Sequence, residues 1–310
     1  MSIYEFAEDL RADLAAELGD LAEIRVLTVT KNNSVTRTAL SVIPKGTCVT
    51  PAIYLEDYYR RFREGTCRRT LLLEILRQIR EHGGRPFMAE DILSWERASE
   101  HLFPMLVNRE RNRGRALGSP HRDLLDLTVL YYLRLELEGG KIGTAVVPDR
   151  LMARWGRREE ELYETAVANL SSEPVECVSI REKLLDFREV WDEDLEPVDK
   201  WSEESLKLHV LTNAGRRLGA AAVLCPGLLQ RCCREKGWEK AYVLPSSIHE
   251  LLLLPFSVQT PVSKLQEIVR AVNRSSVAEE EQLSDAVYLY STEEDRLSLI
   301  PSSEEGDFPA

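Results

Sequence analysis

Residues 241–255 read Ala-Tyr-Val-Leu-Pro-Ser-Ser-Ile-His-Glu-Leu-Leu-Leu-Leu-Pro. The apolar run 241–244 and the segment 248–254, which is apolar except for His249 and Glu250, lie on either side of the turn-forming residues Pro-Ser-Ser. Short apolar runs bounded by turn residues are typical of buried strands. We therefore expect two neighbouring strands here, and these strands decide the fold of the C-terminal third.

The segments on both sides of this pair extend the same pattern. Upstream we expect strands at 206–212 and 219–224 around a turn at 213–215, and then a helix at 226–235 that begins with its proline. Downstream we expect a helix at 262–272 and strands at 286–290 and 297–300, joined by a turn at 291–295. Residues 201–300 are thus predicted to form an antiparallel sheet with packed helices, followed by a polar tail at 301–310.

Residues 1–85 predict an α-β-β-α unit. Apolar residues recur at every fourth position over 4–18, ahead of Gly19, which predicts an amphipathic helix with a glycine cap. Segments 22–30 and 35–43 are rich in β-branched residues and flank Lys31-Asn32-Asn33-Ser34, whose asparagines tolerate the left-handed backbone of a hairpin turn. Helical spacing resumes after Leu55 and ends at the glycine pair 83–84.

Residues 86–200 predict a mainly helical middle region. We expect helices at 89–106, 148–156 and 159–170, and one strand within 124–137. The stretch 189–204 holds eight carboxylates against the single Lys200, and its Trp191 and Trp201 indicate a loop docked at two points. The predicted class is therefore α+β: an N-terminal helix plus β-hairpin unit, a helical middle, and a C-terminal antiparallel sheet with packed helices.

Composition restricts the class of protein. The 310 residues are 44% hydrophobic, enough for a sizeable core, and carry a net charge of -12, which opposes a general electrostatic grip on nucleic acid or anionic lipid. Glu5, Glu8 and Asp9 occupy the place of the basic and apolar parts of a secretory signal, so we expect a cytoplasmic location. Six scattered cysteines without C-x-x-C spacing predict reduced thiols, and neither a metal nor a cofactor is expected.

Several strings of residues together resemble one bacterial family, domain-of-unknown-function family 5688, over nearly the whole chain. They are Lys31-Asn32-Asn33; Pro51-Ala52-Ile53-Tyr54-Leu55; Val107-Asn108 with Asn112; Ser119-Pro120-His121-Arg122-Asp123 with Asp126-Leu127; Leu211-Thr212-Asn213 with Gly219-Ala220-Ala221; Leu244-Pro245-Ser246-Ser247-Ile248-His249-Glu250; and Leu283-Ser284-Asp285 with Val287-Tyr288. The resemblance implies no activity, cofactor or catalytic residue.

The most chemically suggestive string contains Ser246, Ser247, His249 and Glu250. A serine nucleophile needs a base oriented by a third group, yet on one face of an extended strand Ser247 and His249 lie about 6.6 Å apart, beyond hydrogen-bond reach. We favour a turn at the serines and a structural histidine. Asn213, at a predicted turn, is explained by backbone conformation, but its amide joins this candidate site if the two segments converge.

A second cluster contains His121, Asp123 and Asp126, preceded by Asn108. A carboxylate can fix the tautomer of a histidine, and the same residue types suit a metal, but such groups are also common on a solvated turn. We favour a structural or capping role for them.

The only dense basic stretch contains Arg109, Arg111, Arg113 and Arg115. Arginines at this density suit a phosphate or an RNA backbone, but no aromatic residues alternate with them. A solvated helix face is the favoured interpretation.

These observations favour a non-enzymatic binding or protein-interaction protein with a protein partner or small ligand. One alternative is a hydrolase-like enzyme that uses Ser246 or Ser247 with His249 or His121. A second is nucleic-acid binding through Arg109, Arg111, Arg113 and Arg115. The first requires a serine oxygen within about 3.2 Å of a histidine nitrogen. The second requires salt-sensitive binding of short RNA or DNA.

Overall fold

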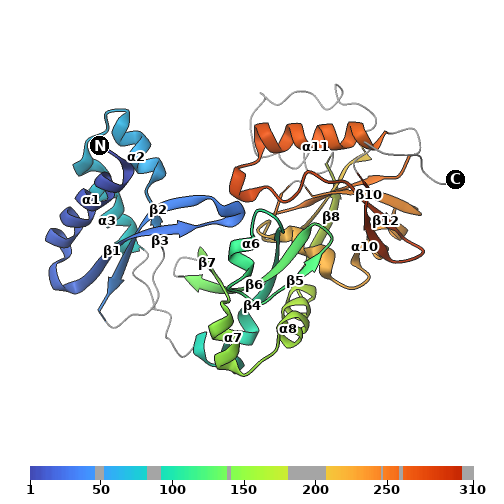
Figure 1. Cartoon of the computed structure of the whole chain (residues 1–310), viewed down its shortest axis with the longest axis horizontal. Coiled ribbons are helices and arrows are strands. Elements are labelled where there is room, and N and C mark those ends of the chain that lie inside the picture. The colour runs from blue at the N-terminus through green and yellow to red at the C-terminus, as the bar shows by residue number, and fades with distance from the viewer. Residues whose placement is uncertain are drawn as a thin grey trace. The chain divides into compact units, whose positions relative to one another are not determined.

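The structure is a computed structural model that describes residues 1–45, 52–81, 92–137, 141–180, 207–245, 247–257 and 261–301. It confirms the α+β class (Figure 1). The chain forms two compact units, one from residues 1–102 and 132–158 and the other from 103–131 and 159–310. The expected boundaries near residues 85 and 200, the acidic loop 189–204 and the tail beyond residue 301 lie outside the described residues and remain predictions.

The first unit begins with the predicted helix and hairpin. Its first elements are α1 (Ile3–Leu18), β1 (Ala22–Thr30), β2 (Thr36–Pro44), β3 (Ala52–Tyr54), α2 (Glu56–Arg63) and α3 (Arg68–Glu81). The α1 helix starts at a capping box, in which Ser2 and Glu5 satisfy each other's backbone amides. The β1 and β2 strands pair antiparallel from Ala22 opposite Pro44 to Thr30 opposite Thr36, and β3 adds to β2.

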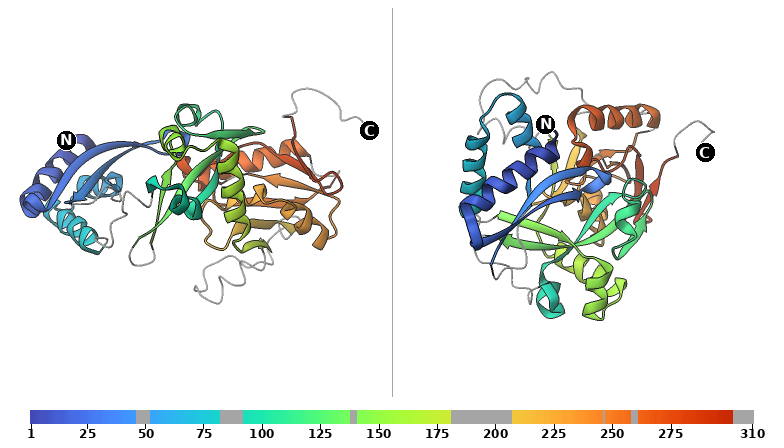
Figure 2. Two further views of the ribbon diagram at one scale, coloured as in Figure 1. Left: turned by 90° about the horizontal axis from the view of Figure 1, so that it is seen from below. Right: turned by 60° about the vertical axis from the view of Figure 1, so that its left-hand side comes forward.

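The three helices bury their apolar faces against this sheet. Phe6 of α1 stacks on Phe62 of α2 at 4.9 Å between ring centroids, and Leu40 of β2 belongs to the same core as Leu71 of α3. The hairpin is longer than the helices that cover it, and its turn projects beyond them (Figure 2). Asn33 in that turn has a φ of 58°, the left-handed conformation predicted for it.

The middle of the chain contains more strand than the sequence predicts. Its elements are α5 (Trp95–Ala98), the 3-10 turn η3 (Ser99–His101), β4 (Leu102–Asn108), α6 (Arg113–Ala116), β5 (His121–Leu124), β6 (Leu127–Leu137), β7 (Lys141–Val146), α7 (Asp149–Trp155) and α8 (Glu159–Ser171). The strands form one sheet in the order β4-β6-β5, with β7 also paired to β6. The predicted strand within 124–137 and the helices near 148–156 and 159–170 are confirmed.

The helix expected over 89–106 is the main difference. Only residues 95–98 form an α-helix there, and Leu102 to Val107 form a strand that is buried at every position. A continuous apolar run fits a strand covered on both faces as well as it fits a helix, and Pro104 disfavours the interior of a helix. The proline is tolerated because β4 ends the path β4-β6-β5.

The C-terminal region of the second unit is the predicted antiparallel sheet. Its elements are β8 (Val175–Ser179), β9 (His209–Asn213), the 3-10 helix η7 (Gly219–Leu224), α10 (Leu228–Glu235), β10 (Lys240–Leu244), β11 (Leu251–Pro255), α11 (Val262–Ser276), the 3-10 turn η8 (Glu279–Glu281), β12 (Tyr288–Ser291) and β13 (Arg296–Leu299). The strand order is β13-β12-β10-β11-β9-β8. All five neighbouring pairs are antiparallel.

Helices cover this sheet on both sides. Leu265 and Val269 of α11 pack against Tyr242, Leu244 and Leu254 on one face. Figure 1 shows α11 along this face and α10 on the other side of the sheet. The central strands β10 and β11 are therefore buried between two layers of helix, which explains their nearly continuous apolar sequence.

The strand expected at residues 219–224 is instead the 3-10 helix η7. Its residues are Gly-Ala-Ala-Ala-Val-Leu, and alanine has a high helix propensity and a low strand propensity. The turn before it also redirects the chain, because Arg216 and Leu218 both have positive φ.

None of the described helices combines the length and the apolar character that crossing a bilayer requires.

Candidate functional site

The segment that contains Ser247 and His249 meets the turn that contains Asn213. The Thr212 hydroxyl donates to the backbone oxygen of His249 at 2.8 Å, and the backbone amide of Ala220 donates to the oxygen of Ile248 at 3.2 Å. The sequence leaves open whether these two segments converge, and in the second unit they do. It is a close packing of backbone, because a Cβ placed on Gly219 would lie 2.6 Å from the His249 oxygen.

The ring of His249 has contacts at both nitrogens. Nδ1 accepts from the backbone amide of Leu218 at 3.1 Å, and Nε2 lies 3.4 Å from Oε1 of Glu281. This pattern assigns a neutral ring with its proton on Nε2. The ring nitrogen that would act as a base is therefore occupied by the main chain, which is the arrangement of a structural histidine.

Ser247 also uses its hydroxyl locally. Its Oγ accepts from the backbone amide of His249 at 3.0 Å, as a serine in a turn commonly does. Glu250 is half-buried directly before β11, and Ser246 lies outside the described residues. The geometry of Ser247 and His249 thus supplies no activated nucleophile for the hydrolase alternative, which remains untested for Ser246.

Asn213 holds its own turn together. Its Oδ1 accepts from the amide of Arg217 at 3.1 Å, and its Nδ2 donates to the Arg217 oxygen at 3.0 Å. Both polar atoms of the amide are therefore used by the backbone of one loop, as expected for an asparagine at a turn.

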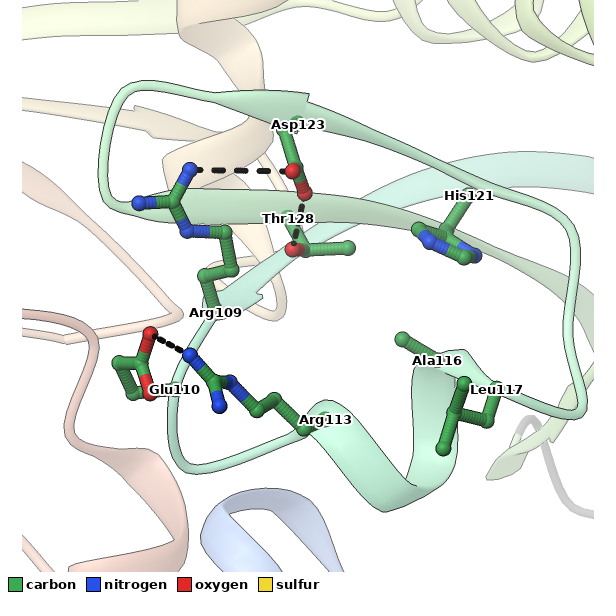
Figure 3. Close-up of a pocket in the computed structure, with 8 residues that line it drawn as sticks. All are labelled: Arg109, Glu110, Arg113, Ala116, Leu117, His121, Asp123 and Thr128. Carbon is green, nitrogen blue, oxygen red and sulfur yellow. Dashed lines mark hydrogen bonds and ion pairs between the residues drawn. The ribbon is translucent and has the colours of Figure 1, made fainter.

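The second predicted cluster is divided between two places. His121 and Asp123 line a pocket of about 400 Å³ in the second unit, whereas Asp126 belongs to a separate network. The pocket lies between the loop after β4 with α6 and the β5–β6 hairpin (Figure 3). Its lining residues are Arg109, Glu110, Arg113, Ala116, Leu117, His121, Asp123 and Thr128.

Arg109 has an unusual environment within this pocket. Its Nη1 lies 3.7 Å from Oδ2 of Asp123, which is an ion pair but is longer than a hydrogen bond. Within the described part of the chain the guanidinium has no hydrogen-bond partner, and its side chain is 43% exposed. The fork of five N–H donors therefore faces the pocket largely unused.

The carboxylates of the pocket are held by its own residues. Asp123 accepts from the Thr128 hydroxyl at 2.9 Å, and Glu110 accepts from Arg113 at 2.7 Å (Figure 3). Thr128 is buried on β6, so it fixes one oxygen of Asp123 and leaves the other turned towards Arg109.

His121 and two apolar residues complete the pocket. Nδ1 of His121 lies 2.9 Å from the backbone oxygen of Ser119, which assigns a proton to Nδ1. Ala116 and Leu117 form the apolar wall, and Leu117 is 84% exposed. The pocket thus combines guanidinium donors, an imidazole and an apolar wall.

Asp126 ties the β5–β6 turn to the C-terminal sheet. Its Oδ2 accepts from Ser284 at 2.5 Å, and its Oδ1 accepts from the Tyr288 hydroxyl. Burial, followed by the charge of Asp126, raises the pKa of Tyr288 well above its ordinary value, so the hydroxyl remains a donor. Asn108 makes a parallel contact, because its Nδ2 donates to the Leu283 oxygen at 3.1 Å. These residues form a structural clasp.

Two further arginines of the basic stretch have protein partners. Arg111 donates to Oε1 of Gln282 at 2.8 Å, and Arg113 binds Glu110. Arg115 lies in the one-turn helix α6. The charge of Arg113 is therefore paired with a carboxylate, whereas Gln282 is a neutral partner for Arg111.

The sequence did not link the arginines to His121. It assigned Arg109 and His121 to different candidate sites, although they line one pocket. The hairpin β5–β6 was not predicted from the sequence. It places His121 and Thr128 beside the loop that follows β4 and carries Arg109. The Asp126 clasp was missed because Ser284 and Tyr288 lie 158 and 162 residues away in the chain.

Among the residues that the structure describes, no group of three or more histidine, cysteine, aspartate or glutamate side chains is placed to hold a metal ion.

Comparison of the chain with known proteins identifies a family but no activity. No curated protein and no solved structure matches the chain. The model of a Family of unknown function (DUF5688) matches residues 3–292, nearly the whole chain. The chain therefore belongs to this family.

Proposed function

We propose that this chain is a non-enzymatic binding protein whose pocket beside Arg109 receives a carboxylate-bearing segment of a protein partner. The observation that carries the proposal is the guanidinium of Arg109. It is 43% exposed, faces the pocket and has only an ion pair of 3.7 Å with Asp123 among the described residues. An arginine fork in this state suits bidentate binding of a carboxylate.

The remaining lining residues favour a peptide over a polyanion. Glu110 and Asp123 already place two negative charges beside the two arginines, and the whole chain carries a net charge of -12. A nucleic-acid backbone would be repelled by both, whereas a single carboxylate can pair with Arg109 alone. The exposed Leu117 beside Ala116 offers contact area for an apolar side chain next to that carboxylate.

The proposal is tested with fluorescently labelled short peptides in a binding titration. The probe ends in Leu-Glu with a free carboxylate, and its twin ends in Leu-Gln amide, which removes both negative charges. We expect Arg109→Gln to weaken binding of the acidic probe by about tenfold or more, because one hydrogen-bonded charge pair is lost.

Arg296→Gln is the matched control. Arg296 is 70% exposed, is in the same unit and pairs with Glu294 at 2.7 Å, so its loss removes the same charge away from the pocket. Equal affinities for the acidic and amide peptides, or equal losses in the two arginine variants, would overturn the proposal. A short RNA that binds better than the acidic peptide and loses affinity with salt would support the nucleic-acid alternative instead.

A further inference from the structure

Cys177 of β8 lies on the face of the C-terminal sheet that α10 covers, which is the face away from α11. In an antiparallel ladder, directly opposed residues share a face. Cys177 of β8 opposes Leu211 of β9, and Leu211 opposes Leu251 of β11. Leu252 and Leu254 lie on the α11 side, so the odd-numbered Leu251, and with it Cys177, lies on the side of α10.

The α10 helix crosses this face close to β8. Lys236, at the C-cap of α10, donates from Nζ to the backbone oxygen of Cys177 at 3.4 Å. Two residues later, the ring of Trp238 packs edge-on against His209 of β9 with 4.9 Å between ring centroids. Ser179 opposes His209 in the ladder, so this contact lies on the same face as Cys177. Two independent contacts therefore fix the end of α10 over β8 and β9.

Cys232 lies one helical turn before Lys236, on the same side of α10, so its side chain is directed towards the face of the sheet that carries Cys177. The thiols of Cys177 and Cys232 are hydrogen-bonded to each other. Cys232 is buried, whereas Cys177 is half-buried on the edge-strand β8. Both are free thiols, together with Cys67, Cys225 and Cys233, in the described part of the chain.

In the hydrogen bond between the two thiols, Cys177 is the donor and Cys232 is the acceptor. The hydrogen bond from Cys177 lowers the pKa of Cys232 to about 7. Burial raises this pKa, but the positive charge of Lys236 also lowers it. The same hydrogen bond, together with burial, raises the pKa of Cys177. A thiolate that accepts a hydrogen bond from a neighbouring thiol has the protonation pattern that disulfide formation requires.

We propose that Cys177 and Cys232 form a reversible disulfide when the protein meets a hydroperoxide. The Cys232 thiolate attacks one oxygen of hydrogen peroxide, the O–O bond breaks, and sulfenic acid and hydroxide form. The Cys177 sulfur then attacks the Cys232 sulfur, the S–O bond breaks, and water leaves with the thiol proton. The hydroxide takes up the proton that the Cys232 thiol released when it ionised, so the two thiols are oxidised to one disulfide and the peroxide is reduced to two waters. A thiol reductant reverses the oxidation of the protein. This inference is independent of the Arg109 pocket.

Cys233 is the competing partner next in sequence. Its thiol is hydrogen-bonded to Thr292, and it is completely buried. Neighbouring residues of a helix point in directions about 100° apart, so Cys232 and Cys233 cannot both face β8. The structure therefore assigns the bond to Cys232.

The test is peroxide treatment of the full chain, followed by alkylation, proteolysis and mass spectrometry without reductant. We expect a linked pair of peptides around Cys177 and Cys232, reduced in mass by two hydrogens and released by dithiothreitol. Cys232 and Cys233 fall between the same two arginines, so Cys233→Ser is the variant that separates them. The linked peptides should form in Cys233→Ser and in Cys225→Ser, and should be lost in Cys232→Ser and in Cys177→Ser.

The wild-type peptide map is decisive even if a serine variant does not fold. Alkylation of both Cys177 and Cys232 after peroxide treatment, a link from Cys177 to Cys233, or a link that persists in Cys232→Ser would each overturn the proposal. A faster reaction at pH 8 than at pH 6 is expected, because the thiolate fraction of Cys232 rises through its pKa of about 7. Equal rates at both pH values would contradict the assignment of Cys232 as the attacking thiolate.

Discussion

At the scale of single residues, Gly219 explains why the turn after β9 and the segment before β11 can pack so closely. A Cβ at this position would lie 2.3 Å from Oγ1 of Thr212 and 2.7 Å from the amide nitrogen of Asn213. We therefore predict that Gly219→Ala lowers the free energy of unfolding by about 3 kcal/mol, because the backbone must move apart. Gly118→Ala is the control, since a Cβ there meets no atom within 4 Å. Equal urea midpoints for the two variants would contradict this packing.

The Asp126 clasp gives a second prediction at the same scale. Asp126 accepts from Ser284 and Tyr288, and hydrogen bonds to a charged group each contribute about 2 kcal/mol. We predict that Asp126→Asn and Tyr288→Phe each destabilise the protein in urea unfolding, and that the double variant loses less than the sum of the two losses. Tyr290→Phe is the control, because Tyr290 donates to Asp295, and its effect should add to that of Asp126→Asn. Additive losses for Asp126→Asn with Tyr288→Phe would show that the clasp is not energetically coupled.

At the scale of the elements, the first residue of α8 connects the helix to two strands. Glu159 accepts from Arg122 of β5 at 2.8 and 2.7 Å, and also from the hydroxyl of Tyr131 on β6. Burial raises the pKa of Glu159, but the bonds from Arg122 and Tyr131 outweigh it and leave the pKa below 4.5. Arg122 in turn lies over the ring of Tyr163 at 3.7 Å, so it connects two turns of α8 to the sheet.

This depressed pKa makes a prediction about acid stability. A carboxyl whose pKa is lower in the folded state stabilises the fold above its unfolded value and loses that contribution as the pH falls through the folded value. The stability difference between wild type and Glu159→Gln should therefore be full at pH 7 and should shrink below about pH 4.5. Urea unfolding across this range measures the difference, and Glu160→Gln controls for the loss of one charge in the same turn. A difference that grows as the pH falls would contradict the assignment.

The elements also show which parts of the fold could be predicted. The helix at α1, the β1–β2 hairpin and the strands β10 to β13 follow from local patterns, because their periodicity and turn residues are encoded within a few positions. The strand β4 and the 3-10 helix η7 were not predicted, although Pro104 in β4 and the three alanines of η7 are local signals against the expected helix and strand. The burial of Leu102 and the fit of Gly219 against His249 also stabilise these elements, and they depend on residues far along the chain. The pocket was missed for the same reason: the pairing of β5 with β6 places His121 and Thr128 near Arg109.

At the scale of the whole molecule, the family strings have two kinds of role. Thr212, Gly219 and His249 build the packing between neighbouring segments of the C-terminal sheet, and Asn108 and Asp126 build the clasp. Only the string around His121 and Asp123 contributes to a pocket. The functional account of this member of the DUF5688 family, whose model matches residues 3–292, therefore rests on Arg109 and its neighbours.

Two other arginines of this chain serve as internal references for the proposal that Arg109 binds a carboxylate. Arg122 binds Glu159, and Arg61 binds Glu74 at 2.7 and 2.8 Å, each through two bonds, whereas the fork of Arg109 has no hydrogen bond among the described residues. A carboxylate ligand should therefore engage Arg109 and leave the two occupied forks unchanged.

The most direct test is an NMR titration of the arginine Nε–Hε signals with the acidic Leu-Glu peptide. We predict that the Arg109 signal shifts and saturates, while the signals of Arg122 and Arg61 do not move. An Arg109 signal that stays in place, or a uniform drift of all exposed arginines without saturation, would contradict the proposal that this pocket binds a carboxylate.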